Sequence, residues 1–349
     1  MTRPDVTVMG GGIMGLSAAW ACAARGARVR LFEVAHPGAG ASGGTVGALA
    51  PHVPDPWNGK KQLQLDALLS AETFWAEIAE ISGQDPGYAR DGRLQPIEDA
   101  AALDRARARE AEAAARWGAA ATWQVRPSGD FGDWAPCSPT GYVIHDTLSA
   151  RLSPRRAGAA LVAALAARGV AVETGNAPPG GPPVIWATGI AGLAALSDDL
   201  GRKVGQGVKG QSALLRHAAT DLPQIGAPGL HIVPHADGTV AVGSTSENSY
   251  DDGLATDTLL DDVIAAARAV CPALADAPVT QRWAGIRPRA RSRAPMLGPW
   301  PGRPGHFVLN GGFKIGFGLA PVLGRMAAEL ALEGAEPPDW MRVEASLRK

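Results

Sequence analysis

A glycine-rich segment near the start of the chain has the spacing of a phosphate-binding turn. Gly10, Gly12 and Gly15 form the pattern GxGxxG, directly after the apolar run at 6–9 and directly before a helical pattern. Glycines at these positions allow a tight turn, a close approach of a pyrophosphate to the backbone, and close packing of a helix on a strand. The helix N-terminus would face the phosphates with unpaired N–H groups and its positive dipole end.

The residues around these glycines complete a dinucleotide-binding pattern. Ile13 and Met14 occupy the variable positions of the turn, and a second apolar run ends at Glu33. A carboxylate at the end of this second strand would accept hydrogen bonds from an adenosine ribose. Residues 6–33 therefore predict a βαβ unit that binds a dinucleotide, although a single unit of this kind does not separate NAD from FAD.

Other kinds of chemistry have no clear pattern in the sequence. It has no Ser-His-Asp arrangement, metal-ligand cluster or P-loop, so we expect no metal site. Cys22, Cys137 and Cys271 lie far apart, which argues against a disulfide scaffold and fits a reducing compartment. The 33 basic and 34 acidic residues leave a net charge of −1, so nucleic acid is not an expected partner.

The elements that must position these residues alternate between strands and helices. A chain of 349 residues with 46% hydrophobic and 19% charged residues predicts a folded α/β protein of two domains. Strands are expected at 6–9, 27–33, 171–174, 184–189, 212–216, 230–235, 239–245 and 307–310, and helices at 16–26, 62–82, 98–117, 154–169, 255–270 and from about Leu319. The Pro/Gly/Trp-rich segment 127–142 lacks periodicity and is expected to be irregular, as a cover over the site.

This order of elements predicts a chain that leaves and re-enters one nucleotide-binding domain. Residues 1–83, 146–203 and 283–349 are assigned to that domain, and residues 84–145 and 204–282 to an antiparallel second domain. A strand-like run begins almost at the N-terminus, so no signal peptide is expected, and no apolar stretch reaches the roughly 18 residues that would span a bilayer. The expected location is the cytoplasm.

Five segments decide which dinucleotide is expected. They are GAGASGGTVGALAP at 38–51, VIWATG at 184–189, VKGQ at 208–211, WAGIRP at 283–288 and NGGFKIGFGLAP at 310–321. Together with the glycine motif, these segments resemble the FAD-dependent D-amino-acid oxidase family, and most closely its glycine oxidase and sarcosine oxidase branch. The resemblance implies a Rossmann-type FAD-binding domain of the GR2-like kind, interleaved with an antiparallel-sheet α+β substrate domain.

The resemblance also assigns cofactor contacts. It implies that the FAD pyrophosphate and ribose contact Ser42, Gly43 and Gly44, that the flavin ring contacts Gly47, Ala48 and Leu49, and that the adenosine passes near Gly189. The flavin pyrimidine edge is assigned to the turn formed by Gly312, Phe313, Lys314, Ile315, Gly316 and Phe317, whose N–H groups would stabilise negative charge there. Non-covalent FAD is expected, because no cysteine lies near 283–318 and Val46 occupies the region where some relatives carry a flavin-linked histidine.

The substrate residues follow from the same comparison. Arg287 matches the family arginine that holds an α-carboxylate in a bidentate pair. His231 stands where the glycine oxidase branch has a tyrosine, and Lys314 stands where it has an arginine, so both are candidate substrate contacts. Arginines at 289, 291 and 293 depart from the family pattern, and they could bind a second anionic group or form a solvated basic edge.

The implied activity is oxidation of the C–N bond of a small amino acid or secondary amine. The substrate would be a D-amino acid, glycine or an N-substituted glycine, with hydride transfer to flavin N5 and hydrolysis of the imine product. Oxygen, a quinone or a partner chain could accept the electrons, and the oligomeric state stays open. Two alternatives remain: an FAD-dependent 2-hydroxy acid dehydrogenase on the same fold, and an FAD-binding subunit of a heteromeric amine or opine dehydrogenase.

Overall fold

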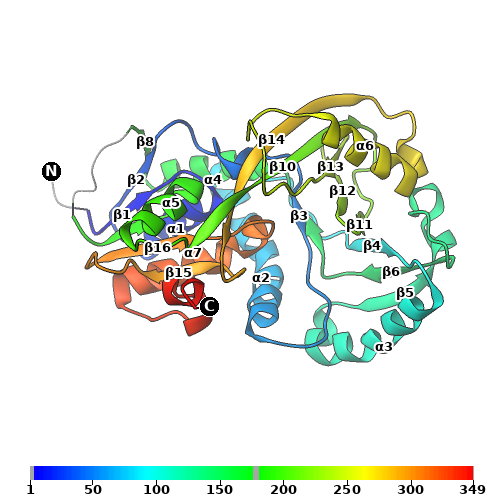
Figure 1. The fold of residues 1–349 in the computed structure, drawn as a ribbon, viewed down its shortest axis with the longest axis horizontal. Coiled ribbons are helices and arrows are strands. Elements are labelled where there is room, and N and C mark those ends of the chain that lie inside the picture. The colour runs from blue at the N-terminus through cyan, green and yellow to red at the C-terminus, as the bar shows by residue number, and fades with distance from the viewer. Residues whose placement is uncertain (1–3, 176–180, 349) are drawn as a thin grey trace.

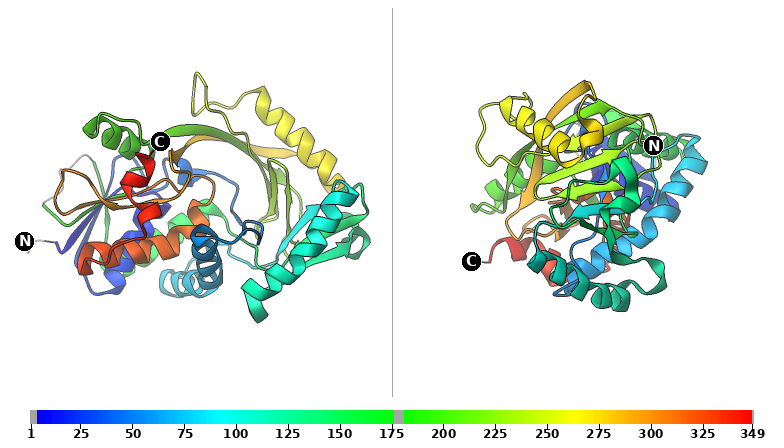
Figure 2. Two further views of the ribbon diagram at one scale, coloured as in Figure 1. Left: turned by 60° about the horizontal axis from the view of Figure 1, so that its bottom comes forward. Right: turned by 90° about the vertical axis from the view of Figure 1, so that its right-hand side faces the viewer.

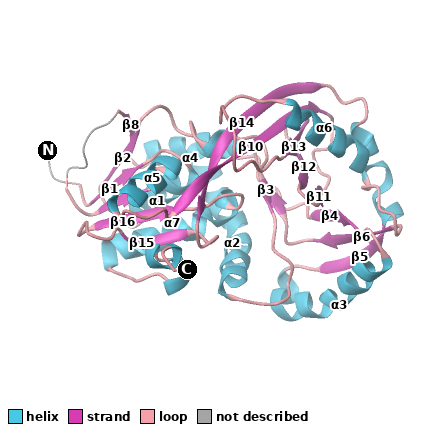
Figure 3. Ribbon diagram, viewed as in Figure 1, coloured by secondary structure: helices cyan, strands magenta, loops and turns pink. Residues whose placement is uncertain are grey.

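The structure is a computed structural model that describes residues 4–175 and 181–348. Residues 1–3, 176–180 and 349, which the sequence assigns to the cofactor domain, lie outside the described part. The described chain forms two large sheets, and the strands β10 and β14 extend from one toward the other (Figure 1). Helices flank both sheets (Figure 3).

The first sheet is mainly parallel and carries the N-terminal βαβ unit. Its six strands, in spatial order, are β15 (Met296–Pro299), β16 (His306–Asn310), β9 (Val184–Trp186), β1 (Val6–Met9), β2 (Val29–Glu33) and β8 (Val172–Thr174). Neighbouring strands are parallel except β15 and β16, which are antiparallel. All four residues of β1 are buried, as expected for a strand covered on both faces.

Helices from distant parts of the sequence cover this sheet. They are α1 (Ile13–Ala24), α4 (Pro154–Ala167), α5 (Gly189–Asp199) and α7 (Gly316–Glu333), and α2 (Gly59–Ser82) packs against α4 and α7. Figure 2 shows α1, α4 and α7 on one side of the sheet and α5 on the other. The contact between α1 and α7 is close enough that a Cβ at Gly324 would lie 2.6 Å from the carbonyl oxygen of Ser17.

The second sheet is mainly antiparallel and has eight strands. In spatial order they are β14 (Val279–Ala290), β10 (Gly205–Arg216), β13 (Thr239–Gly243), β12 (Leu230–Pro234), β11 (Gln224–Ala227), β4 (Arg93–Pro96), β6 (Tyr142–Asp146) and β5 (Trp123–Pro127). Helix α6 (Thr258–Val270) packs on β10, β12 and β13, and α3 (Ala100–Trp117) packs on β5. A short ribbon of β3 (Ala48–Leu49) and β7 (Ala150–Arg151) completes the strands.

The structure corrects several expected elements. Helix α7 begins at Gly316, one turn before the expected Leu319, because the glycine-rich turn already adopts helical geometry. Strand β14 was missed as a long strand, and it ends at Ala290, so Arg291 and Arg293 lie in the turn that follows. Strands β4, β5 and β6, which pair with one another, were not expected; the segment 127–142 between β5 and β6 is irregular, as expected, apart from a short 3-10 helix at Ser128–Trp134.

Two properties of the described residues bear on the expected location and on metal binding. No described helix combines the length and apolar character that crossing a membrane would require. Within residues 4–175 and 181–348, no group of three or more His, Cys, Asp or Glu side chains could hold a metal ion. The three cysteines are free thiols.

Candidate active site

A cavity of about 700 Å³ joins the glycine-rich turn to the second sheet. Its walls come from the β1–α1 turn, the segment 39–52, the end of β9, strand β14 and the turn before α7. The parallel strands β1 and β9 end at this cavity, which is where ligands bind in open α/β sheets. The irregular segment 127–142 does not line it, so the expected cover over the site is wrong. Trp134 of that segment instead packs into the core of the second sheet.

The nucleotide end of the cavity has the geometry that the glycine motif predicts. Gly10 has φ +111°, and a Cβ there would lie 2.4 Å from the carbonyl oxygen of Ala187. A Cβ at Gly15 would lie 1.8 Å from the carbonyl oxygen of Gly10, so only glycine lets α1 pack against the turn. Gly10, Gly12, Ile13 and Met14 line the cavity, whereas Gly15 lies behind them.

Glu33 lies at the end of β2 and is tied to the turn. The backbone N–H of Gly11 donates to its Oε2 at 2.7 Å, and the N–H of Ala35 donates to its Oε1 at 3.1 Å. The carboxylate still lines the cavity, so its remaining lone pairs can accept from a ribose hydroxyl.

The second glycine segment lies beside the N-terminus of α1. The N–H of Ile13 donates to Ser42 Oγ at 2.9 Å, so Ser42 caps the helix from another part of the chain. Ser42, Gly44, Gly47 and Ala48 line the cavity. Gly43 and Leu49 do not: Gly43 packs on the carbonyl oxygen of Gly38, and Leu49 alternates with Ala48 and points into the core.

Gly189, which the resemblance places near the adenosine, lines the cavity at the start of α5. The predicted redox and substrate residues meet at the other end of the cavity. The turn between β16 and α7 contributes Gly312, Phe313, Lys314, Ile315, Gly316 and Phe317. Arg287 from β14 and His231 from β12 line the same cavity, so the structure brings all three candidate substrate residues together.

The electrostatics of this end are strongly positive. Burial lowers the pKa of Arg287 to about 10, so the guanidinium stays cationic near pH 7. Burial, together with the charges of Arg93, Lys314 and Arg287, lowers the pKa of His231 to about 4, so its imidazole is neutral at pH 7. Lys314 is exposed to the cavity, yet desolvation by the wall and repulsion from Arg287 lower its pKa.

Arg287 is held from two sides. Its Nη1 donates to the carbonyl oxygen of Thr245 at 3.1 Å. A Cβ at Gly210 on the paired strand β10 would lie 1.8 Å from Arg287 Nη2, so the guanidinium lies over bare backbone. Gly210 belongs to the VKGQ segment, and its missing side chain makes room for Arg287.

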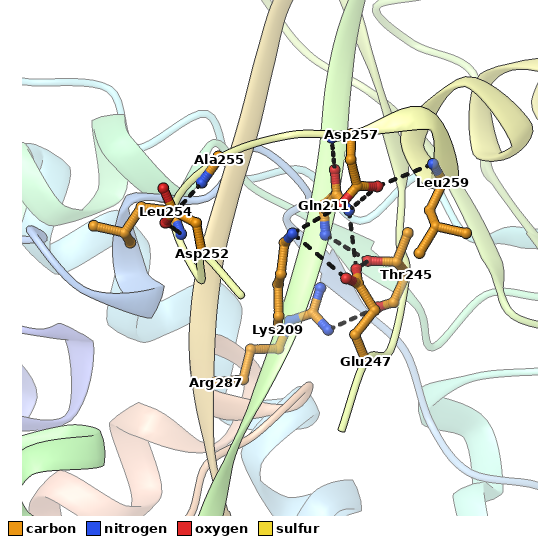
Figure 4. A network of polar contacts seen from close by, with 10 residues as sticks. All are labelled: Lys209, Gln211, Thr245, Glu247, Asp252, Leu254, Ala255, Asp257, Leu259 and Arg287. Atoms are coloured by element: carbon orange, nitrogen blue, oxygen red, sulfur yellow. Dashed lines mark hydrogen bonds and ion pairs between the residues drawn. The ribbon is translucent and has the colours of Figure 1, made fainter. Parts of the chain in front are cut away.

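A buried polar network holds the Thr245 carbonyl in place (Figure 4). Lys209 Nζ lies 2.9 Å from Asp257 Oδ2 and 3.5 Å from Glu247 Oε2. Gln211 Nε2 donates to Asp257 at 2.8 Å and to Glu247 at 3.0 Å, and the Gln211 N–H donates to Thr245 Oγ1 at 2.9 Å. Thr245 Oγ1 in turn donates to Glu247. The VKGQ residues thus link strand β10 to the segment that carries Thr245.

Several lining residues were not identified from the sequence. Arg93 is buried and pairs with Asp146 at 2.9 Å. Trp283 packs against Gly44, which explains why the WAGIRP segment begins with a tryptophan. Arg93 gave no signal, because it is the first residue of the short strand β4, and its place in the cavity depends on pairing between β4 and β11.

The residues present fit an extended dinucleotide. The cavity runs from Glu33 to Arg287, its wall at Gly10 and Gly12 is bare backbone, and the N-terminus of α1 faces it. At the other end, the N-terminus of α7 opens into the cavity beside the turn at 312–317. The fold and the cavity therefore define a dinucleotide-binding redox enzyme.

Comparison with known proteins gives the family. The chain belongs to the FAD dependent oxidoreductase family, which matches residues 5–330, and its cofactor is FAD. It is 38% identical over 131 residues to a glycine oxidase of Pseudomonas aeruginosa, an alignment that covers 37% of this chain and only 36% of that protein. It is 28% identical over 364 residues to a glycine oxidase of Geobacillus kaustophilus, which covers 94% of this chain and 93% of that protein.

Solved structures agree with this assignment. The crystal structure of glycine oxidase from Geobacillus kaustophilus aligns with a TM-score of 0.83 at 22% identity, over 97% of this chain and 96% of that chain. The crystal structure of iminodiacetate oxidase from Chelativorans sp. BNC1 aligns with a TM-score of 0.81 at 25% identity, over 96% of both chains. The predicted family, fold class and cofactor are confirmed. The residue boundaries of the two domains stay a prediction.

Proposed function

We propose that this chain oxidises the C–N bond of a small amino acid or secondary amine, with Arg287 as the anchor for the substrate α-carboxylate. The observation that carries the proposal is the cationic guanidinium in the cavity wall, which forms no ion pair at contact distance with any described carboxylate. Relatives named as oxidases of glycine and of iminodiacetate, both amines that bear a carboxylate, support the same substrate class.

The proposed roles follow from the chemistry of the side chains. FAD supplies, when bound, the two-electron oxidation of the substrate C–N bond. Arg287 binds both carboxylate oxygens through its planar fork and so fixes the orientation of the substrate. His231 is neutral near pH 7, and its buried Nδ1, which has no hydrogen-bond partner among the described residues, can bond to the substrate amine.

The site predicts how the reaction depends on pH. An ammonium group cannot give up an electron pair, so the substrate amine must lose its proton before oxidation. Since Arg287 stays cationic and His231 stays neutral from pH 7 to pH 9, we expect the rate of flavin reduction to rise over this interval. Stopped-flow absorbance under anaerobic conditions measures this rate, and a rate that falls from pH 7 to pH 9 would count against oxidation of the neutral amine.

The experiment that tests the proposal is anaerobic titration of the purified FAD-loaded protein. Glycine, sarcosine, D-alanine and iminodiacetate are compared with glycolate and D-lactate, while the loss of flavin absorbance is recorded. The proposal expects bleaching by members of the amine group, and bleaching by the hydroxy acids alone would contradict it. Readmission of air then reports whether oxygen accepts the electrons.

A further inference from the structure

The substrate end of the cavity holds more positive charge than one carboxylate neutralises. Within the described residues, Arg287 donates a hydrogen bond to the neutral carbonyl of Thr245 and forms no ion pair. Lys314 makes no hydrogen bond or ion pair with any described residue, and its ammonium only lies 5.9 Å from the centre of the Phe313 ring. Both side chains line the same cavity and lie close enough for repulsion from Arg287 to lower the pKa of Lys314.

The other charged groups that line the cavity already have partners. Arg93 pairs with Asp146 at 2.9 Å and also reaches the carbonyl oxygen of Pro51. Glu33 accepts from two backbone N–H groups at the nucleotide end of the cavity. At the substrate end, Lys314 therefore has no counter-charge among the described residues, and Arg287 forms no ion pair, although the carboxylate of Glu247, itself held by Lys209, is close enough to favour its charged form.

A substrate with one carboxylate would leave one of these cations unmatched. The guanidinium of Arg287 can satisfy both oxygens of one carboxylate. Lys314 is exposed to the cavity, and a ligand that covered its ammonium without a counter-charge would leave a costly desolvated cation. A second acidic group on the substrate removes this cost.

The neighbouring arginines do not provide an alternative site for that second group. Arg289 donates to Asn248 Oδ1 at 2.8 Å and packs over the Phe313 ring, and it does not line the cavity. Arg291 and Arg293 are exposed in the turn after β14. These three arginines therefore form a solvated basic edge outside the cavity.

We propose that the substrate is an amino acid or secondary amine with two carboxylates, one bound by Arg287 and the other by Lys314. Acidic D-amino acids and N-carboxyalkyl glycines are the chemical class that meets this requirement. His231 lines the cavity with these two cations, and its unpartnered Nδ1 is available to the amine between the two carboxylates. This inference rests on the proposed C–N oxidation and names its substrate class.

The test compares substrates that differ only in the second acidic group. D-aspartate is paired with D-asparagine, and iminodiacetate is paired with its monoamide, in steady-state assays of the FAD-loaded protein. We expect kcat/KM for at least one diacid to exceed that of its amide by about tenfold or more, the effect of one charge-assisted hydrogen bond. Equal values, or a preference for both amides, would overturn the proposal, because Arg287 and Lys314 would then share one carboxylate.

Substitution identifies the residue responsible for the preference. In Lys314→Met, a side chain of similar length without charge, the diacid-to-amide ratio should fall about tenfold, whatever the absolute rates. Arg291→Met removes an exposed arginine outside the cavity and should leave the ratio unchanged. If Lys314→Met slows diacid and amide equally, Lys314 does not bind the second carboxylate and the proposal fails.

A binding measurement separates this inference from the proposed function. Diglycolate and methoxyacetate have an ether oxygen in place of the amine, and they carry two carboxylates and one carboxylate respectively. The flavin difference spectrum gives their Kd in wild type and in Lys314→Met without turnover. Tighter diglycolate binding that requires Lys314 supports the diacid site even if no amine reduces the flavin. Turnover of glycine without any preference for diacids would contradict this inference, but it would agree with the proposed function.

Discussion

Gly210 shows how a missing side chain can determine where a catalytic-site arginine lies. It pairs with Gly285 across β10 and β14, and the guanidinium of Arg287 lies over its backbone. The atoms that a Cβ at Gly210 would meet are the flexible end of Arg287 rather than backbone. A methyl group there would therefore displace the guanidinium and leave the strands paired.

Replacement of Gly210 by alanine tests this reading. In Gly210→Ala we expect KM for the substrate to rise about tenfold or more, because Arg287 can no longer lie between Thr245 and β10, while flavin content is retained. Gly158→Ala is the matched control, since a Cβ at that helical glycine meets no atom within 4 Å. An unchanged KM in Gly210→Ala would mean that the backbone of Gly210 does not position Arg287.

At the level of elements, the network around Gln211 joins β10 to the segment that leads from β13 into α6. Gln211 is fully buried, and its side chain bonds Glu247, the carboxylate of Asp257 and the N–H of Asp257. Asp257 also caps the N-terminus of α6, because its carboxylate accepts from the N–H of Leu259. One glutamine thus links the strand, the helix cap and the Thr245 segment.

Loss of the Gln211 amide should therefore affect both stability and substrate binding. In Gln211→Leu we expect the free energy of unfolding to fall by about 2 kcal/mol, because Glu247 and Asp257 lose their hydrogen bonds to this buried amide. KM should rise as well, because Thr245 loses its support. Urea unfolding and steady-state assays measure the two effects. Gln206→Leu, at a partly exposed position of the same strand, serves as the control and should change neither.

Elements formed by local interactions could be predicted from the sequence, whereas elements that depend on pairing between distant segments could not. The βαβ unit at 6–33 could be predicted because the apolar runs, the glycines and Glu33 lie within one local pattern. The length of strand β14 was not predicted, because polar residues such as Arg282 and Arg289 interrupt the alternation of polar and apolar residues that is typical of a strand. Its extent is determined by its pairing with β10. Strand β4 was missed for the same reason, since it pairs with β6 and with β11 from residues 224–227.

Positions in the active site were predictable by two routes. Gly10 and Gly12 were identified because a phosphate-binding turn needs them locally, and Ser42, Arg287, His231 and Lys314 were identified through the family resemblance. Arg93 and the partner role of Gly210 could not be read from the chain, because each depends on a strand from a distant segment. Lys314 was already a predicted substrate contact, but the structure was needed to show that Arg289, Arg291 and Arg293 do not line the cavity with Arg287.

For the whole molecule, two desolvated histidines predict how stability depends on pH. Burial lowers the pKa of His231 and of His235 to about 4, whereas in the unfolded chain each titrates near its ordinary value of about 6.5. Between these values the unfolded state binds more protons than the folded state. Stability is therefore full above about pH 6.5 and falls as the pH drops toward 4, by about 1.4 kcal/mol per pH unit for each histidine at most.

Urea unfolding of the FAD-loaded protein at pH 7.0, 6.0 and 5.0, with a fixed excess of FAD, measures this slope. His235→Asn should reduce the loss between pH 7.0 and 5.0, because one of the two depressed pKa values is removed. The matched control is His36→Asn, which replaces an exposed histidine and should show the same dependence of stability on pH as the wild type. A wild-type free energy that is flat from pH 7.0 to 5.0 would show that these imidazoles are not kept neutral by the fold.

The central claim is that Arg287 brings a carboxylate-bearing amine to the FAD site. Anaerobic titration of Arg287→Met with the amine that bleaches the wild-type flavin most readily tests it directly. We predict that the variant retains its flavin spectrum and needs about 100-fold more substrate for half-maximal bleaching, because a partly buried charge-assisted pair has been removed. Half-maximal bleaching at the wild-type concentration would contradict the account.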